Sequence, residues 1–349
     1  MRLLVTGGAG FIGSAFVRRR LEATTDDIMV LDKLTYAGDR ANLAESEERP
    51  DAPDRYRFIE GDIADRPLVD SLVREVDAVV NFAAESHVDR SILEPSAFLV
   101  TGVLGVHALL DAVVQANAAR GEASIRFLQV STDEVYGSVP EGLSVEDDPL
   151  RPNSPYSAAK ASGELLVRAF RETHGLDTVI TRGANTYGPQ QNPEKLIPLF
   201  ITNALQDLPL PMYGDGMQLR DWLYVDDHAD AVGVVLDQGE PGAIYNVPGE
   251  GVERPNREVT RAILDALGKP WSLVREVPDR PGHDRRYAMD GTRLRALGWA
   301  PRVPFAEGIA RTVRWYAEHE ARWRAARDGA FEDYYRRQYA WRLERSAAS

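Results

Sequence analysis

Cysteine is absent from all 349 residues of this chain. Disulfide bonds, thiolate metal sites and a thiol nucleophile are therefore excluded. An excess of positive charge is also lacking, because 54 acidic residues outnumber 41 lysines and arginines and give a formal net charge of −13. Nucleic acid and anionic membrane surfaces bind a basic face, so we expect neither as a partner. A small anionic ligand would need a local basic pocket.

Targeting and metal-binding signals are absent as well. We see no apolar stretch long enough to cross a membrane, and an apolar strand that begins at residue 2 leaves no room for a signal peptide, so we expect a cytoplasmic protein. The six histidines are scattered without ligand spacing, so no metal site is predicted. We interpret Asp226-Asp227-His228 as a helix cap beside a packed imidazole.

The pattern that is present is an alternation of strands and helices. At 44% apolar content, the chain can bury a large core. The alternation predicts a doubly wound parallel Rossmann sheet followed by a smaller C-terminal α/β lobe that binds the substrate. We place the boundary between residues 1–182 and 183–349, with some elements of the second part returning to the first. The expected strands are 2–6, 28–31, 56–60, 77–81, 125–130 and 178–182, the main helices are 11–21, 95–119 and 155–174, and the candidate loops are 36–54 and 137–152.

A glycine-rich turn follows the first strand directly. Glycines at positions 7, 10 and 13 of Gly7-Gly8-Ala9-Gly10-Phe11-Ile12-Gly13 allow a tight turn, close approach of the backbone to a pyrophosphate, and close packing of helix on strand. The second strand ends at Asp32, where a carboxylate accepts hydrogen bonds from a ribose hydroxyl and repels a 2′-phosphate. Strand, turn, helix and aspartate in register predict a dinucleotide site that prefers NAD to NADP.

Acidic and phenolic side chains follow the strand at 125–130. Thr132, Asp133 and Glu134 are expected at its carboxyl end, the edge of a parallel sheet where ligands bind. Tyr156 and Lys160 lie four residues apart on one face of the helix at 155–174. We expect the ammonium to lower the pKa of the phenol, so that Tyr156 can take a proton from a sugar hydroxyl. Taken alone, this Tyr-x-x-x-Lys spacing is equally consistent with an ordinary surface helix.

Together these motifs resemble the extended short-chain dehydrogenase/reductases that act on nucleotide sugars, and within that family the branch of 4,6-dehydratases. The resemblance covers almost the whole chain. It rests on Thr6–Gly13, Asp32–Gly38, Ala83–Ser91, Ser131–Gly137, Pro193–Pro198 and Arg280–Tyr287. The acid pair discriminates within the family, because related epimerases usually lack it and UDP-glucuronate decarboxylases have Ser-Glu at the same positions.

The resemblance implies an NAD-dependent lyase that converts dTDP-glucose to its 4-keto-6-deoxy product for deoxysugar biosynthesis. Tyr156, activated by Lys160 and close to Thr132, would remove the C4 hydroxyl proton while hydride passes to tightly bound NAD. Glu134 would then abstract the C5 proton, and a protonated Asp133 would protonate the departing C6 hydroxyl before hydride returns to C6. Unequal environments can hold adjacent carboxyl groups in different protonation states. The resemblance also implies a homodimer.

Two sets of ligand contacts are carried over from the family. The predicted cofactor contacts are Gly7, Gly10, Phe11, Ile12, Gly13, Asp32, Lys33, Leu34, Thr35, Asp62, Ile63, Ala83, Ala84, Ser86, Thr101, Tyr156, Lys160 and Thr186. The predicted substrate contacts are Ser86, His87, Thr132, Asn185, Lys195, Leu196, Pro211, Met212, Tyr213, Arg220, Asn256, Arg280, His283 and Tyr287.

A basic set in the distal half suits a diphosphate. Its members are Arg182, Lys195, Arg220, Arg280, His283, Arg285 and Arg286. We expect about half to touch the ligand, since a single arginine is more often salt-bridged or solvated. One departure from the family concerns Ala184-Asn185-Thr186-Tyr187, where a second asparagine is common in place of Thr186. Whether Thr186 contacts the cofactor therefore stays open. The tail aromatics Phe331, Tyr334, Tyr335, Tyr339 and Trp341 predict a packing seam against the body or a second subunit.

Three alternatives stay open at this point. A UDP-sugar 4,6-dehydratase would differ only in the residues that choose the base. UDP-glucuronate decarboxylation or epimerisation would use the same Tyr-Lys oxidation, but neither expels a C6 hydroxyl and neither needs the acid pair. A non-enzymatic NAD-sensing protein would keep the fold without the catalytic residues.

Overall fold

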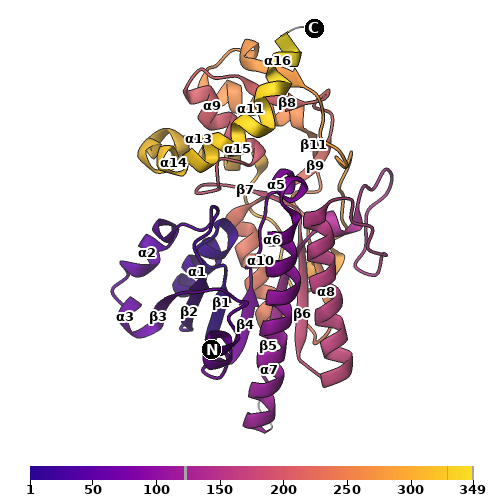
Figure 1. Ribbon diagram of the computed structural model, residues 1–349. Coiled ribbons are helices and arrows are strands. Elements are labelled where there is room, and N and C mark those ends of the chain that lie inside the picture. Colours follow the sequence, from indigo (N-terminus) through magenta and orange to yellow (C-terminus); the bar gives the residue numbers. More distant parts are fainter. Residues whose placement is uncertain (122–123, 328, 348–349) are drawn as a thin grey trace.

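A seven-stranded parallel sheet forms the lower half of the molecule in Figure 1, a computed structural model that describes residues 1–121, 124–327 and 329–347. In spatial order its strands are β10 (Ile244–Val247), β6 (Thr178–Gly183), β5 (Arg126–Thr132), β4 (Ala78–Asn81), β1 (Arg2–Thr6), β2 (Asp27–Asp32) and β3 (Tyr56–Glu60). The chain order reverses between β1 and β4, which creates the crevice where ligands bind in such sheets. The doubly wound fold is confirmed.

Helices cover both faces of this sheet. One face carries α1 (Phe11–Ala23) and α10 (Val225–Gln238), which pack on each other, and the other carries α4 (Arg66–Val73), α7 (Val106–Arg120) and α8 (Pro155–His174). Each side has its own buried core. Since α10 and β10 come from the distal half of the chain, that half does return to the sheet. The boundary at residue 182 itself stays a prediction.

The helix that carries the tyrosine and lysine has strong local end signals. Ser154 caps it in a reciprocal capping box with Ser157, Pro155 occupies its first turn, and Gly175 ends it in a left-handed conformation. The bounds predicted from the sequence, 155–174, are therefore confirmed.

The upper part of Figure 1 is the smaller lobe, which lies over the carboxyl ends of the large sheet. Two small sheets support it, one of β11 (Glu253–Pro255), β9 (Leu219–Tyr224) and β7 (Asn185–Tyr187), the other of β12 (Val274–Val277) and β8 (Leu210–Tyr213). Its helices are α9 (Leu196–Leu205), α11 (Asn256–Leu267), η4 (Trp271–Leu273), α13 (Phe305–Glu318), α14 (Glu320–Ala326), α15 (Gly329–Tyr335), the π-helical η5 (Arg336–Ala340) and α16 (Trp341–Ala347). Helix α12 (Thr292–Ala296) contacts β10 of the large sheet.

Three expectations need correction. The segment 36–54, predicted as a loop, contains the short helices η1 (Arg40–Leu43) and α2 (Ala44–Glu47) and the start of α3 (Ala52–Arg55). Asp226 and Asp227 lie inside the first turn of α10 and do not cap it; Asp227 instead accepts hydrogen bonds from the backbone of Arg302 and Val303 at 2.9 Å.

The third correction concerns membrane-length helices. Helices α5 (Val88–Leu93) and α6 (Pro95–Leu99) precede a π-helical segment, η2 (Val100–Gly105), and α6, η2 and α7 run on into one another over Pro95–Arg120. An 18-residue window of this helix has a mean hydropathy of 2.0, and the helix is long and apolar enough to cross a membrane, so the prediction that no such stretch exists was wrong. About half of its apolar window is buried in the molecule, since it packs on the sheet and on α8.

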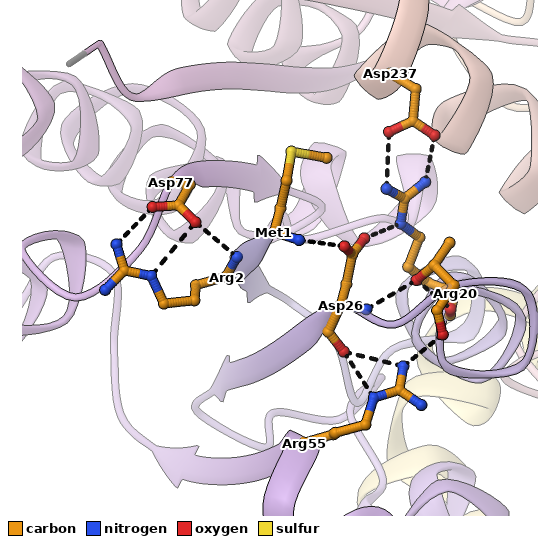
Figure 2. Close-up of polar contacts among 8 residues, drawn as sticks. Met1, Arg2, Arg20, Asp26, Arg55, Asp77 and Asp237 are labelled. Atoms are coloured by element: carbon orange, nitrogen blue, oxygen red, sulfur yellow. Dashed lines mark hydrogen bonds and ion pairs between the residues drawn. The ribbon is translucent and has the colours of Figure 1, made fainter.

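Arg20 on α1 links the first half of the chain to α10 from the second half. In Figure 2 its guanidinium lies between Asp26, before β2, and Asp237 on α10, with donor–acceptor distances of 2.6–2.7 Å. The Asp26 carboxylate also accepts a hydrogen bond from the N-terminal ammonium of Met1. This buried set fastens α10 to α1.

Candidate active site

A cavity of about 340 Å³ lies between the carboxyl ends of the large sheet and the smaller lobe. Residues at the ends of β2, β5 and β6 and in the turns after β1 and β4 form its floor, and residues from α9, β8, β9 and the 280–283 segment form its roof. Every predicted catalytic residue lines this cavity. Of all predicted contacts only Leu34 and Tyr287 do not line it.

The glycine-rich turn fits a pyrophosphate. A Cβ atom on Gly7 would lie 2.5 Å from the Ala83 nitrogen, and one on Gly13 would lie 2.3 Å from the Gly7 oxygen, so both approaches require glycine. Helix α1 begins at this turn without a side-chain cap, which leaves its first N–H groups free for an anion. The residues present therefore fit the phosphate part of a dinucleotide.

Asp32 is positioned for an adenosine ribose. Its carboxylate accepts hydrogen bonds from the backbone nitrogens of Ala9 and Leu34, both at 2.9 Å, and it retains lone pairs for a ligand hydroxyl. Leu34, which we predicted as a cofactor contact, thus orients Asp32 through its backbone. Lys33 lies 3.5 Å from Glu85 and 3.6 Å from Asp62, so its charge is shared with acids at the cavity wall.

The acid pair occupies a short 3₁₀ helix, η3 (Asp133–Tyr136), which begins where β5 ends. Burial, and second the Glu134 carboxylate, raise the pKa of Asp133 to about 8. Burial also raises the pKa of Glu134, but three cations, Arg280, Lys195 and Arg220, oppose this. Asp133 therefore holds a proton more firmly than Glu134, which is the division that an acid and a base require.

The tyrosine and lysine differ from expectation in one respect. Burial and the carboxylates of Glu134 and Asp133 raise the pKa of Tyr156, and a hydrogen bond with Thr132 lowers it; Lys160 is not among the main causes of this shift. The predicted lowering by Lys160 is not found. The Lys160 ammonium instead donates to the carbonyl oxygen of Val130 at 2.9 Å, and burial lowers its own pKa to about 8.

The basic set divides in two. Lys195, Arg220, Arg280 and His283 line the cavity. The other three are paired elsewhere: Arg182 with Glu164 at 2.6 Å, Arg285 with Asp215 at 2.8 Å, and Arg286 with Glu253. Tyr287 lies under the Arg220 guanidinium, 4.0 Å from ring centre to Cζ, so it supports a cavity cation from behind. A guanidinium-rich roof of this kind suits a diphosphate.

Five buried polar atoms of the cavity wall lack partners among the described residues. They are Oγ of Ser131, Oδ1 of Asn185, Nε1 of Trp222, Nε2 of His228 and Nε of Arg280. A buried polar atom without a partner is costly, so these atoms indicate ligand contacts.

Some cavity residues were missed from the sequence. Tyr339 lines the cavity and stacks on Tyr213 with ring centres 5.9 Å apart, while Gln338 donates to the Tyr213 hydroxyl at 2.5 Å. Tyr334 stands edge-on to His87, 5.4 Å between ring centres. The predicted packing seam is thus confirmed for Phe331, Tyr334 and Tyr339, whereas Trp341 is exposed. Tyr339 also forms part of the site, which no local signal in the sequence marks. Glu85 was also missed, although it lies within a recognised motif.

The described residues contain no group of three or more acidic or histidine side chains placed to hold a metal ion.

Comparison with known proteins places the chain among characterised enzymes. The family model described as GDP-mannose 4,6 dehydratase matches residues 4–312. The dTDP-glucose 4,6-dehydratase of Streptomyces antibioticus is 52% identical over 93% of this chain and 94% of its own length. The low-salt glycan biosynthesis protein Agl12 of Haloferax volcanii is 52% identical over 90% of this chain and 98% of its own length.

Among solved structures, a similar one is that of DesIV, a dTDP-glucose 4,6-dehydratase from Streptomyces venezuelae, with NAD and TYD (thymidine diphosphate) bound. It superposes with a TM-score of 0.88 at 52% identity, over 93% of this chain and all of that one.

Proposed function

The chain belongs to the GDP-mannose 4,6-dehydratase family, and on that premise we propose that it is an NAD-dependent dTDP-glucose 4,6-dehydratase. The product is dTDP-4-keto-6-deoxy-D-glucose and water. The observation that carries this assignment is the acid pair Asp133–Glu134, held with Tyr156 in one cavity whose roof brings Lys195, Arg220 and Arg280 toward Glu134.

Bound NAD accepts hydride in the oxidation at C4 and donates it in the reduction at C6. It would be held by the turn at Gly7–Gly13, by Asp32 and by the neighbouring lining residues. Tyr156 would take the proton of the C4 hydroxyl as a phenolate, a form that the raised pKa disfavours and that the positive charge of a bound nicotinamide would favour. Thr132 lies within hydrogen-bonding reach of the phenol. The resulting 4-ketone makes the C5 proton acidic.

Elimination then uses the two carboxyl groups. Glu134 removes the C5 proton, the C6–O bond breaks, and Asp133 gives its proton to the departing hydroxyl, so that water leaves and a C5–C6 double bond forms. After reduction at C6, the proton held by Glu134 returns to C5. A decarboxylase or epimerase expels no hydroxyl, so it needs no protonated acid beside the base.

Incubation of the purified protein with dTDP-glucose in heavy water, without added NAD, tests this proposal by mass spectrometry. We expect a product that has lost one water and gained one carbon-bound deuterium. UDP-glucose serves as the competing substrate and tests the preference for thymidine. Unchanged dTDP-glucose, with UDP-glucuronate losing carbon dioxide instead, would overturn the assignment.

The variant Glu134→Gln tests the role of Glu134 as the general base. We expect it to slow deuterium entry at C5 and water loss together by about 10²–10⁴-fold, the usual contribution of a general base. Glu141→Gln, on the exposed loop after the site, is the matched control and should leave both rates unchanged.

We further propose that two copies associate through the helices α6, η2 and α8. Leu99, Val100, Leu104 and Leu165 are 41–61% exposed on these neighbouring helices, which leaves an apolar face on an acidic protein. Leu104→Glu with Leu165→Glu should convert a dimer to a monomer in light scattering. Leu208→Glu, equally apolar but on the other lobe, should not. The cytoplasmic location of the protein stays a prediction.

A further inference from the structure

His228 has an environment that its interpretation as a packed imidazole does not explain. It lies in the first turn of α10, is 2% exposed and lines the cavity. Its ring sits against Gly183 at the end of β6, where a Cβ atom would lie 2.4 Å from the ring Cε1. Glycine at position 183 therefore allows the ring to reach the cavity wall.

The hydrogen bonds of Thr186 determine which ring nitrogen carries the proton. The Thr186 hydroxyl has a single proton, which it donates to the carbonyl oxygen of Ala184 at 3.0 Å. With that proton engaged, we assign the 2.7 Å contact with Nδ1 of His228 to the ring N–H as donor. Nδ1 is protonated, and Nε2 presents a bare lone pair.

That lone pair has no partner among the described residues. Burial, and second the Lys160 charge, lower the pKa of His228 to about 4, so the ring is neutral at pH 7 and Nε2 can only accept. A buried acceptor of this kind requires a donor from a ligand.

The position of the ring indicates which part of the ligand supplies the donor. The ring packs against Gly183, which is the register partner of Thr132 on β5, and Lys160 is hydrogen-bonded to Val130 on the same strand. Besides burial, Lys160 is also the charge that lowers the pKa of His228. The ring therefore lies near the Tyr156–Lys160 pair, where oxidation takes place, and away from Asp32 at the adenosine end. The donor group that a nicotinamide carries beside its reacting carbon is the carboxamide N–H.

We propose that Nε2 of His228 accepts a hydrogen bond from the carboxamide of bound nicotinamide, and that Thr186 is a positioning residue that fixes the ring for this contact. The inference rests on the proposed use of NAD. It gives Thr186, where relatives commonly have a second asparagine, a role through His228. A carboxamide held at one edge keeps the same face of the nicotinamide toward the sugar in both hydride steps.

A cofactor competition tests the proposal without measuring turnover. Purified protein, first freed of the NAD that it carries, is incubated with equal and excess concentrations of NAD and 3-acetylpyridine adenine dinucleotide, which keeps the carbonyl but has no amide N–H. After desalting, the bound nucleotides are counted by mass spectrometry. We expect the native chain to prefer NAD by about tenfold, the usual effect of leaving one buried acceptor unpaired. His228→Leu should remove this preference.

Thr186→Val and Thr186→Ser form the matched pair. Valine has the shape of threonine without the hydroxyl and should lose most of the preference, whereas serine keeps the hydroxyl and should retain it. Because this pair perturbs packing little, it decides the matter if His228→Leu fails to fold. In addition, a nitrogen NMR spectrum of labelled histidine should show one unprotonated Nε2 whose resonance moves when NAD binds.

An unchanged preference in both His228→Leu and Thr186→Val would overturn the inference. Equal loss of both nucleotides would also overturn it, since that result assigns His228 to a ribose hydroxyl or to packing alone. A protein that binds neither nucleotide would instead contradict the proposed function.

Discussion

Asp133 and Glu134 are adjacent residues with different surroundings. Asp133 is 4% exposed and has one nearby arginine, whereas Glu134 faces three cations that come from distant parts of the chain. The difference in protonation between Asp133 and Glu134 therefore depends on the roof of the cavity, which lies over the end of β5.

The raised pKa of Asp133 predicts the pH dependence of turnover. Asp133 acts as an acid, so its protonated form must be populated, and that form is lost as the pH rises through about 8. We expect kcat to be level below this pH and to fall about tenfold per unit above it. Steady-state product formation between pH 6 and 10 measures this.

Asp133→Asn is the control for that profile, because the pKa of Lys160 is also about 8. The variant should be slower by about 10²–10⁴-fold and should lack the descending limb. A limb that persists in Asp133→Asn would assign it to Lys160.

At the scale of elements, the close approach of α1 to β1 depends on Gly13. In Gly13→Ala the new Cβ would meet the backbone oxygen of Gly7 at 2.3 Å, which cannot yield as a flexible side chain would, so the helix must retreat. We expect purified Gly13→Ala to carry less than a tenth of the NAD of the native chain, measured by release on denaturation.

Gly233→Ala is the matched control in α10. There a Cβ meets only the Arg20 guanidinium at 3.8 Å, so NAD content should be unchanged and the free energy of unfolding should rise by about 0.5–1 kcal/mol. Equal NAD content in the two variants would contradict the role given to Gly13.

The tail helices form one wall of the site. Tyr339 is 4% exposed and stacks on Tyr213, so we expect Tyr339→Ala to lower the free energy of unfolding by about 3 kcal/mol and to raise KM with little change in kcat. Trp341→Ala, two residues on and 42% exposed, should change neither quantity appreciably. Denaturant unfolding and steady-state kinetics measure both, and an unchanged KM in Tyr339→Ala would exclude the tail from the substrate site.

At the scale of the whole molecule, α10 belongs to the distal half of the chain but is fastened to the first half by Arg20 (Figure 2). Removal of the Arg20 guanidinium leaves the buried Asp26 carboxylate with the Met1 ammonium alone and removes the ion pair of Asp237. We therefore expect Arg20→Met to lower the free energy of unfolding by about 3 kcal/mol in denaturant titration, with kcat unchanged.

Arg2 provides the comparison in the same picture. Its pair with Asp77 is exposed on both sides, so Arg2→Met should leave unfolding unchanged within error. A similar loss of unfolding free energy in both variants would show that the contribution of Arg20 to stability does not depend on its burial.

Local patterns in the sequence determined the elements that position the chemistry. The glycine-rich turn, the strand before the acid pair and the helix at 155–174 follow from short-range periodicity, caps and turn residues, and the structure has them where they were predicted. Nearly all of the predicted contacts also line the cavity, and many of them lie at or just after the carboxyl end of a strand whose direction is fixed by the parallel sheet.

Only the tertiary structure decided which of seven similar cations face the ligand, that Tyr339 reaches the cavity, and that His228 presents a bare nitrogen there. It also reversed the expected direction of the Tyr156 pKa shift. These properties depend on burial and on charges brought together from distant parts of the chain. A pKa or a contact of that kind has no local signature in the sequence, because it exists only once the chain has closed around the site.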